Sequence, residues 1–130
     1  MNPISPKIKT GTVGELLVQL RLLQFGVQAA PPLKDSGNDL IAIKGECFRA
    51  VQVKTTTREE FNKGNLPDKY HILAVVFLAG ENQNIWLDGS KVFLIEKKKV
   101  HGLSKKIDGL GEFAISAELI DSIFNIEGNS

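Results

Sequence analysis

The sequence contains little cysteine and no long apolar run. Its 130 residues include one cysteine, Cys47, which excludes an intrachain disulfide framework and a cysteine-rich zinc site. The most apolar run, residues 72–79, is far too short to span a bilayer. The opening stretch, MNPISPKIKT, lacks the apolar core of a signal peptide. We therefore expect a cytoplasmic protein in a reducing compartment, with no membrane association.

A large excess of charge of one sign is also absent. The chain has 16 Lys and Arg against 15 Asp and Glu, for a net charge of +1. This balance excludes a strongly basic protein that coats DNA nonspecifically, although it allows a local basic face. Hydrophobic residues make up 42% and charged residues 24%, as in ordinary soluble domains. Because a typical domain has about 100–200 residues, we expect residues 1–130 to form a single domain.

Hydrophobic periodicity predicts a helix near the start of the chain. Thr10 or Thr12 is the expected N-cap, and the helix is expected to end near Phe25, before Gly26. Residues 1–9 contain two prolines and are predicted to be a loop. The helix carries apolar residues on two sides, so we expect it to be substantially buried.

Several strands are predicted to follow this helix. They are expected at residues 27–30, 39–44, 47–55, 70–78, 84–87 and 91–96, with a short helix near residues 58–62 and a final helix from Ser116 or Ala117 to Phe124. The order of helix, strands and helix indicates a small α/β or α+β domain with a mixed sheet.

The strongest signal for a functional site is the predicted hairpin around Gly45-Glu46. A two-residue turn at this Gly-X pair places Asp39 opposite Gln52. Because side chains alternate along a strand, Asp39, Gln52 and Lys54 are expected to share one face and to converge at the open end of the hairpin. A three-residue loop would shift the register by one residue and send Asp39 to the other face.

The residues at this open end have the chemistry of a magnesium site. A carboxylate beside amide and backbone oxygens suits Mg²⁺, so Asp39, Gln52 and the Val53 carbonyl are candidate ligands. Glu15 supplies a second carboxylate if its helix packs on the same face. Mg²⁺ polarises a phosphodiester and lowers the pKa of its bound water. Lys54 is expected to help deprotonate that water and to stabilise charge developing on the phosphate.

Each of these residues also has an ordinary structural explanation. Asp39 suits the start of a strand, and Gln52 and Lys54 suit solvated strand positions. Glu15 suits the capping-box partner of Thr12 or a first-turn charge that interacts with the helix dipole.

These residues resemble the PD-(D/E)xK nuclease superfamily, which has the restriction-endonuclease-like fold. The resemblance spans residues 11–57 and rests on Gly14-Glu15, the helix that ends at Gly26, residues 36–40 (SGNDL) and residues 51–55 (VQVKT). It implies a mixed β-sheet core flanked by helices. It also implies a Mg²⁺ site, which accepts Mn²⁺ as a substitute, built from Glu15, Asp39, Gln52 and Lys54.

The sequence departs from the family at two positions. Many members have Glu at the position of Gln52, and Asn38 stands where Pro often precedes the aspartate. Gln is the variant of Mrr-type restriction enzymes and of a cyanobacterial-type homing endonuclease, and the helix-first layout is similar to archaeal Holliday-junction resolvases. The loss of one negative charge at Gln52 is expected to weaken metal binding.

The resemblance implies a Mg²⁺-dependent DNA endonuclease in which Lys54 assists hydrolysis. The residues expected to contact DNA are Thr55, Thr56, Arg58, Lys63, Lys97, Lys98 and Lys99, although such residues are also common on solvated strands and loops. Because one site per chain must cut two strands, we expect a homodimer or homotetramer. Its contact is expected in the strands between Trp86 and Glu96 or in the C-terminal helix.

Two other functions fit the sequence. The first is a catalytically inactive module of the nuclease fold that binds nucleic acid or a protein partner, which the glutamine at position 52 keeps open. The second is a small structural or interaction domain with no nucleic-acid role.

Overall fold

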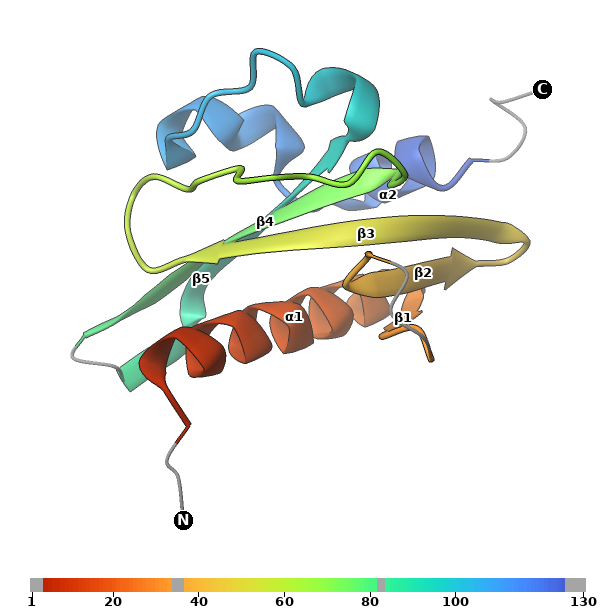
Figure 1. Cartoon of the computed structure of the whole chain (residues 1–130). Helices are drawn as coiled ribbons and strands as arrows, with labels where there is room; N and C mark the ends of the chain where they lie inside the picture. Colours follow the sequence, from red (N-terminus) through yellow and green to blue (C-terminus); the bar gives the residue numbers. More distant parts are fainter. Residues whose placement is uncertain (1–3, 34–36, 82–83, 126–130) are drawn as a thin grey trace.

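The computed structural model describes residues 4–33, 37–81 and 84–125, which form one sheet with helices packed against it (Figure 1). The elements in chain order are α1 (Pro6–Gln24), β1 (Gln28–Ala30), β2 (Leu40–Lys44), β3 (Cys47–Thr56), β4 (Ile72–Glu81), β5 (Asn84–Glu96), the 3₁₀ turns η1 (Lys97–Lys99) and η2 (Ile107–Phe113), and α2 (Ala117–Ile123). The predicted α/β class with a mixed sheet is confirmed.

The strands of the sheet follow one another in chain order, β1-β2-β3-β4-β5. Neighbouring strands are antiparallel except for β3 and β4, which are parallel. A parallel pair needs a crossover connection. Residues 57–71 provide it, because they return the chain to the end of the sheet where β3 begins.

The register of the β2–β3 hairpin is the one that the sequence predicts. Lys44 pairs with Cys47 and Ile41 pairs with Ala50, so the turn has two residues. Gly45 has a φ of 60°, the positive value that two-residue hairpin turns require at this position. The hairpin therefore sends Asp39 and Gln52 to the same end of the strand pair.

The helix α1 begins earlier than the sequence analysis predicts. Its N-cap is Ser5, whose hydroxyl accepts a hydrogen bond from the Ile8 amide at 3.2 Å, and Pro6 occupies the first turn, where its missing N–H is no loss. The predicted N-caps Thr10 and Thr12 are therefore wrong, as is the predicted loop over residues 6–9. The predicted C-terminal end is confirmed, because α1 ends at Gln24.

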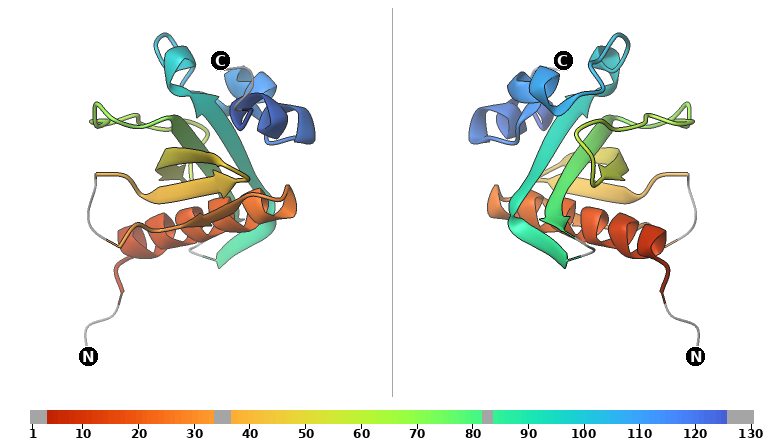
Figure 2. Two further views of the ribbon diagram at one scale, coloured as in Figure 1. Left: turned by 90° about the vertical axis from the view of Figure 1, so that its right-hand side faces the viewer. Right: turned by 90° about the vertical axis from the view of Figure 1, so that its left-hand side faces the viewer.

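Each face of the sheet has its own apolar core (Figure 2). The helices α1 and α2 cover one face, and the buried residues of this core include Leu17, Val18, Leu22, Leu40, Val51, Ile72, Ala74, Ile120 and Ile123. The 57–71 crossover and the segment around η2 cover the other face, with Phe61, Tyr70, Leu73, Phe77, Phe93, Leu110 and Phe113. The two-sided cover explains why β4 is buried along most of its length.

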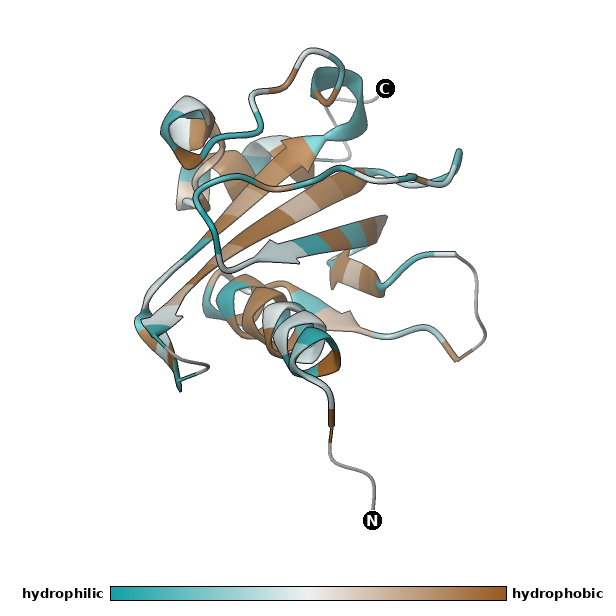
Figure 3. Cartoon of the chain, turned by 60° about the vertical axis from the view of Figure 1, so that its left-hand side comes forward, coloured by the Kyte–Doolittle hydropathy of each residue, from teal (hydrophilic) through white to brown (hydrophobic). Residues whose placement is uncertain are grey.

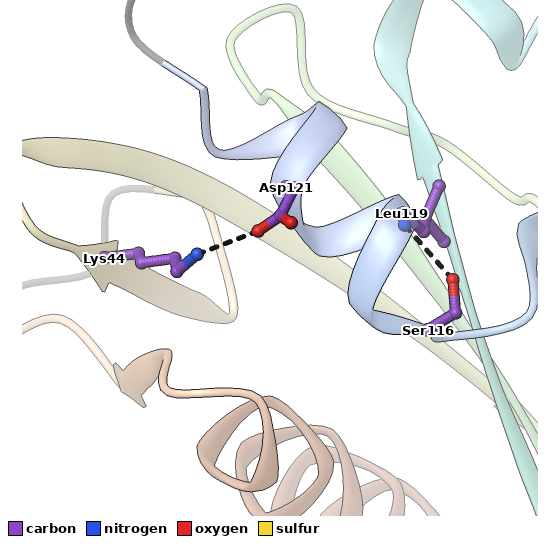
Figure 4. A network of polar contacts seen from close by, with 4 residues as sticks. All are labelled: Lys44, Ser116, Leu119 and Asp121. Atoms are coloured by element: carbon purple, nitrogen blue, oxygen red, sulfur yellow. Dashed lines mark hydrogen bonds and ion pairs between the residues drawn. The ribbon is translucent and has the colours of Figure 1, made fainter.

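The helix α2 matches its prediction, and Figure 4 shows its N-cap and its ion pair with β2. The Ser116 hydroxyl accepts a hydrogen bond from the Leu119 amide at 3.1 Å and so caps the helix. The Lys44 ammonium forms an ion pair with Asp121 at 3.2 Å, which connects α2 to the end of β2.

Three predictions about the elements are wrong. The outer side of α1 is not buried, because Leu16, Leu20 and Leu23 are 57%, 50% and 59% exposed, and α1 carries hydrophobic bands on its visible surface (Figure 3). The two strands predicted for residues 84–96 are the single strand β5, which continues through Asp88-Gly89. Residues 58–62 form no helix. Within the described ranges, none of the helices has both the length and the apolar character needed to cross a bilayer.

Gly14 allows α1 to approach β3 very closely. A Cβ atom at Gly14 would overlap the Thr55 hydroxyl and would lie 2.7 Å from Cγ2 of Thr55. Gly14 is buried in this contact. The absence of a side chain therefore sets the distance between the helix and the strand at the point where Glu15 follows.

We expect Gly14→Ala to lower the free energy of unfolding by about 1–3 kcal/mol, because the added methyl group overpacks the helix against Thr55. Gly11→Ala is the matched control on the same helix, since its Cβ meets nothing within 4 Å. The control is expected to raise the free energy of unfolding by about 0.5–1 kcal/mol through helix propensity. Urea unfolding measures both, and equal effects of the two substitutions would contradict the close contact.

Candidate active site

A cleft of about 790 Å³ opens between the first half of α1 and the second half of β3; we call it the α1–β3 cleft. Its wall contains two carboxylates and three cations. The lining residues are Pro6, Lys7, Ile8, Thr10, Gly11, Thr12, Glu15, Asp39, Val53, Lys54, Thr55, Thr56, Thr57 and Arg58. Three of the four residues predicted to be catalytic, Glu15, Asp39 and Lys54, therefore share one cavity.

The cleft lies where β3 extends beyond its pairing with β2. Leu40, the first residue of β2, pairs with Val51, and β3 continues to Thr56. From Val53 onward, the edge of β3 that faces β2 has no strand partner among the described residues. This open edge gives access to the site from both faces of the sheet.

Asp39 is fixed against this open edge. Its Oδ2 atom accepts a hydrogen bond from the Val53 amide at 2.7 Å, and its own amide donates to the Val51 carbonyl at 3.0 Å. In a strand, the N–H and C=O of one residue point to the same edge. The Val53 carbonyl therefore points to the edge that holds Asp39, as the predicted ligand role requires.

Glu15 reaches the site by a route that the sequence analysis does not predict. The helix α1 packs on the face of Leu40 and Val51, which is opposite to the face of Gln52 and Lys54, so the expectation that the helix covers the latter face is wrong. Glu15 still lines the cleft, because the sheet is open at this edge. Burial raises the pKa of the Glu15 carboxyl, and repulsion from Asp39 raises it further.

Lys54 extends from β3 toward the 57–71 crossover. Its ammonium lies beside the backbone of Gly64, since a Cβ built on that glycine would be 3.5 Å from Nζ. Lys54 is half-buried and lines the cleft. A cation is thus held at the same cavity as the two carboxylates.

Gln52 is placed differently from the other predicted catalytic residues. It is 6% exposed and is not among the residues that line the cleft. Its Nε2 atom donates hydrogen bonds to the Gly37 carbonyl and, at 2.9 Å, to Oδ1 of Asn38. The metal role of Gln52 stays a prediction.

The residues predicted to contact DNA fall into two groups. Thr55, Thr56 and Arg58 line the cleft, whereas Lys63 and the 97–99 segment do not. The Thr56 hydroxyl accepts a hydrogen bond from the Arg58 amide at 3.1 Å and donates one to the Glu60 carbonyl at 3.1 Å, so it also shapes the start of the crossover.

The basic segment of residues 97–99 lies beside the start of β4. The Lys97 ammonium lies 5.1 Å from the centre of the Tyr70 ring and donates to the Asp68 carbonyl. Lys98 forms an ion pair with Glu96 at 3.8 Å. The predicted contacts of all these residues with DNA stay predictions.

Four residues of the cleft with polar side chains were not among the predicted site residues: Lys7, Thr10, Thr12 and Thr57. Lys7 was placed in a loop because the start of α1 was misjudged. The pair Ser5-Pro6 is the signal that was overlooked, because serine at the N-cap followed by proline is typical of a helix start. Because the helix starts at Pro6, Lys7 lies in its first turn, where it lines the cleft.

The donor set of the site fits a hard divalent cation. Glu15, Asp39 and the Val53 carbonyl offer only oxygen ligands, and Mg²⁺ binds proteins through one or two carboxylates while it keeps several waters. No group of three His, Cys, Asp or Glu side chains suited to a metal occurs in the part of the chain that the structure describes. A donor set of two carboxylates and one carbonyl suits a partly hydrated cation.

The fold is similar to that of a solved bacterial homing endonuclease, I-Ssp6803I, with a TM-score of 0.65 over 96% of this chain and 97% of that chain. The chain has an endonuclease-like α/β fold. The two sequences are 14% identical, so the similarity concerns the fold and leaves the activity open. No family model and no curated protein matches the chain.

The raised pKa of Glu15 gives the fold a dependence on pH. A raised pKa means that the folded protein holds the proton more tightly than the unfolded chain does, so this stabilisation is complete below the ordinary Glu pKa. It is lost as the pH rises through the raised pKa. Without divalent cations, we expect Glu15→Gln to raise the free energy of unfolding at pH 7, and this gain to disappear near pH 4.

Urea unfolding at the two pH values, with a chelator present, measures this effect. Glu112→Gln on the exposed surface is the control and is expected to show no such dependence on pH. A Glu15→Gln variant that is equally destabilised at both pH values would contradict the repulsion between Glu15 and Asp39.

Proposed function

We propose that this chain is a Mg²⁺-dependent DNA endonuclease that hydrolyses phosphodiester bonds. One observation carries the proposal: Glu15, Asp39 and Lys54 line one open cleft, and the Val53 carbonyl points to the edge of β3 where Asp39 is fixed. Two carboxylates beside a lysine are the chemistry that phosphodiester hydrolysis needs. The endonuclease-like fold supports the same function.

Glu15, Asp39 and the Val53 carbonyl would hold the Mg²⁺ ion. When bound, Mg²⁺ supplies a polarising charge for the phosphodiester and lowers the pKa of its bound water. A cation bound here would relieve the repulsion between the Glu15 and Asp39 carboxylates, which adds to the effect of burial in raising the pKa of Glu15. Mn²⁺ is expected to substitute for Mg²⁺.

The cations of the cleft bind the phosphate backbone. Lys54 stabilises the negative charge that develops on the reacting phosphate, while Arg58 and Lys7 contact neighbouring phosphates. The hydroxyls of Thr55, Thr56 and Thr57 line the same wall. Recognition by such groups depends mainly on the phosphates and on DNA shape, and it weakens with salt.

Cleavage of supercoiled, linear and four-way-junction DNA with Mg²⁺ or Mn²⁺ tests the function. We expect Asp39→Asn and Lys54→Ala each to lower the cleavage rate by about 100-fold or more, since each removes a charged group from the reacting centre. Asp108→Asn and Lys91→Ala are matched controls with exposed side chains outside the cleft, and both are expected to cut at the wild-type rate. Metal-independent cutting, or cutting that survives both substitutions in the cleft, would overturn the proposal.

A catalytically inactive nuclease-fold module is the second candidate function. Gln52 favours it, because an amide at this position leaves the site with one carboxylate fewer than many relatives have. Salt-dependent DNA binding without cleavage on any of the three substrates, in either metal, would support this alternative.

We also propose that two copies of the chain associate through an apolar face made of Leu16, Leu20 and Leu23 on α1 and Leu87 on β5. All four side chains are at least half exposed. A cavity lined by α1 and β5 residues, including Leu16, Leu20 and Leu87, lies within this face. The outer edge of β5 over residues 84–91 has no strand partner among the described residues. A second copy fits because one site per chain must cut two strands.

We expect Leu20→Glu to shift the chain toward monomer, because association would bury the new charge. Leu33→Glu is the matched control, since Leu33 is fully exposed in a loop. Light scattering during gel filtration measures the mass of each. A wild-type chain that stays monomeric at the concentrations at which it cuts both strands would contradict the association.

A further inference from the structure

Gln52 is the buried polar residue of the sheet that most needs an explanation. It is the one polar or charged residue counted as buried in the part of the chain that the structure describes. It stands on β3 between Val51 and Val53, the residues that fix the backbone and the carboxylate of Asp39. A buried amide is retained only where its hydrogen bonds are made.

The amide of Gln52 is oriented by its partners. Nε2 donates to the Gly37 carbonyl and to Oδ1 of Asn38. A backbone carbonyl only accepts hydrogen bonds, so the atom of Gln52 beside Gly37 must be the nitrogen. The side chain therefore acts as a double donor toward the loop that precedes Asp39.

The same loop is held at other points. Nδ2 of Asn38 donates to the Lys69 carbonyl at 3.0 Å, which connects the loop to the end of the 57–71 crossover. The amide and the carboxylate of Asp39 are bonded to β3. Each of the three residues 37–39 is thus hydrogen-bonded to the sheet or to its crossover.

We propose that Gln52 is a positioning residue that holds the 37–39 loop, and through it the Asp39 carboxylate, at the cleft, and that it is not a metal ligand. We call the hydrogen bonds from Gln52 to Gly37 and Asn38 the clamp. The effect of the clamp on metal binding rests on the proposed function, whereas the clamp itself does not. A glutamate at position 52 would set a carboxylate against two oxygen acceptors and would remove both of these hydrogen bonds. Glutamine is therefore required here by hydrogen bonding.

The two roles predict opposite results for Gln52→Glu. If Gln52 were a ligand, the added negative charge would tighten the binding of Mn²⁺, because affinity rises with the charge of the ligands. If Gln52 is a clamp, the substitution weakens Mn²⁺ binding by about tenfold or more, the usual effect of losing a group that orients a ligand. Calorimetric titration of the full chain with Mn²⁺ alone distinguishes them. Gln28→Glu on the exposed strand β1 is the control for added charge and leaves the affinity unchanged.

Asn38→Ala provides a second variant that leaves β3 intact. Because Asn38 and Gln52 act as one unit, we expect the double variant Asn38→Ala with Gln52→Ala to bind Mn²⁺ no more weakly than the worse single variant. Additive losses from the two sites would overturn the clamp, as would tighter binding by Gln52→Glu.

Hydrogen exchange on the metal-free chain tests the clamp without any metal. We expect Gln52→Glu and Asn38→Ala to lower the protection of the Val53 amide, whose acceptor is Asp39, while the amide of Val75 in the core keeps its protection. Unchanged protection at Val53 in both variants would overturn the inference. If the two variants lose protection selectively at Val53 while the wild-type chain neither binds Mn²⁺ nor cuts DNA, the clamp stands and the proposed function is removed.

Discussion

The hydrogen bond from the Val53 amide to the Asp39 carboxylate holds the site together, and it forms because β2 begins only at Leu40, opposite Val51, while β3 continues to Thr56. If β2 extended further, its backbone would occupy this edge of β3 and no side chain could reach it. The carboxylate thus takes the place of a strand partner, and it satisfies a half-buried backbone donor of β3. Because β3 extends beyond its pairing with β2, its edge is open at Val53, and the Asp39 carboxylate can bind there.

The second constraint is the close contact between α1 and β3. Gly14 lets the helix approach Thr55, and Glu15 follows directly at the margin of the sheet. The helix is on the far face from Lys54, yet the Glu15 carboxylate comes close enough to Asp39 for their repulsion to add to burial in raising the pKa of Glu15. The site therefore spans both faces of the sheet at one open edge.

Much of the local structure could be predicted from the sequence, and the reasons differ between elements. The register of the β2–β3 hairpin follows from the Gly45-Glu46 turn, because alternation along a strand leaves one consistent pairing. The residue pairing within this hairpin is therefore determined by the local sequence. The start of α1 was misjudged because Thr12 and Glu15 imitate a capping box, while the stronger pair Ser5-Pro6 lies upstream.

The tertiary relations could not be predicted in the same way. Which face of the sheet α1 covers depends on residues far apart in the chain, and no local pattern records it. The hydrogen bonds of Gln52 depend on the path of the 37–39 loop, so the sequence pattern alone favours a ligand role. The exposed leucines of α1 were expected to be buried. Periodicity shows that a side of a helix is apolar, but it does not show whether another element covers that side.

The order of the strands along the chain has a consequence for how such a protein can change. Glu15, Asp39, Val53 and Lys54 all precede β4, so the candidate site residues belong to α1 and to one hairpin with the residue that precedes it. The crossover, β4, β5 and the C-terminal segments supply the second core and the outer wall, and they meet the cleft mainly at Thr57 and Arg58. Mutations after residue 56 therefore leave all four of these residues in place, and they act on the site through the outer wall and through the contacts that the crossover makes with Asn38 and Lys54.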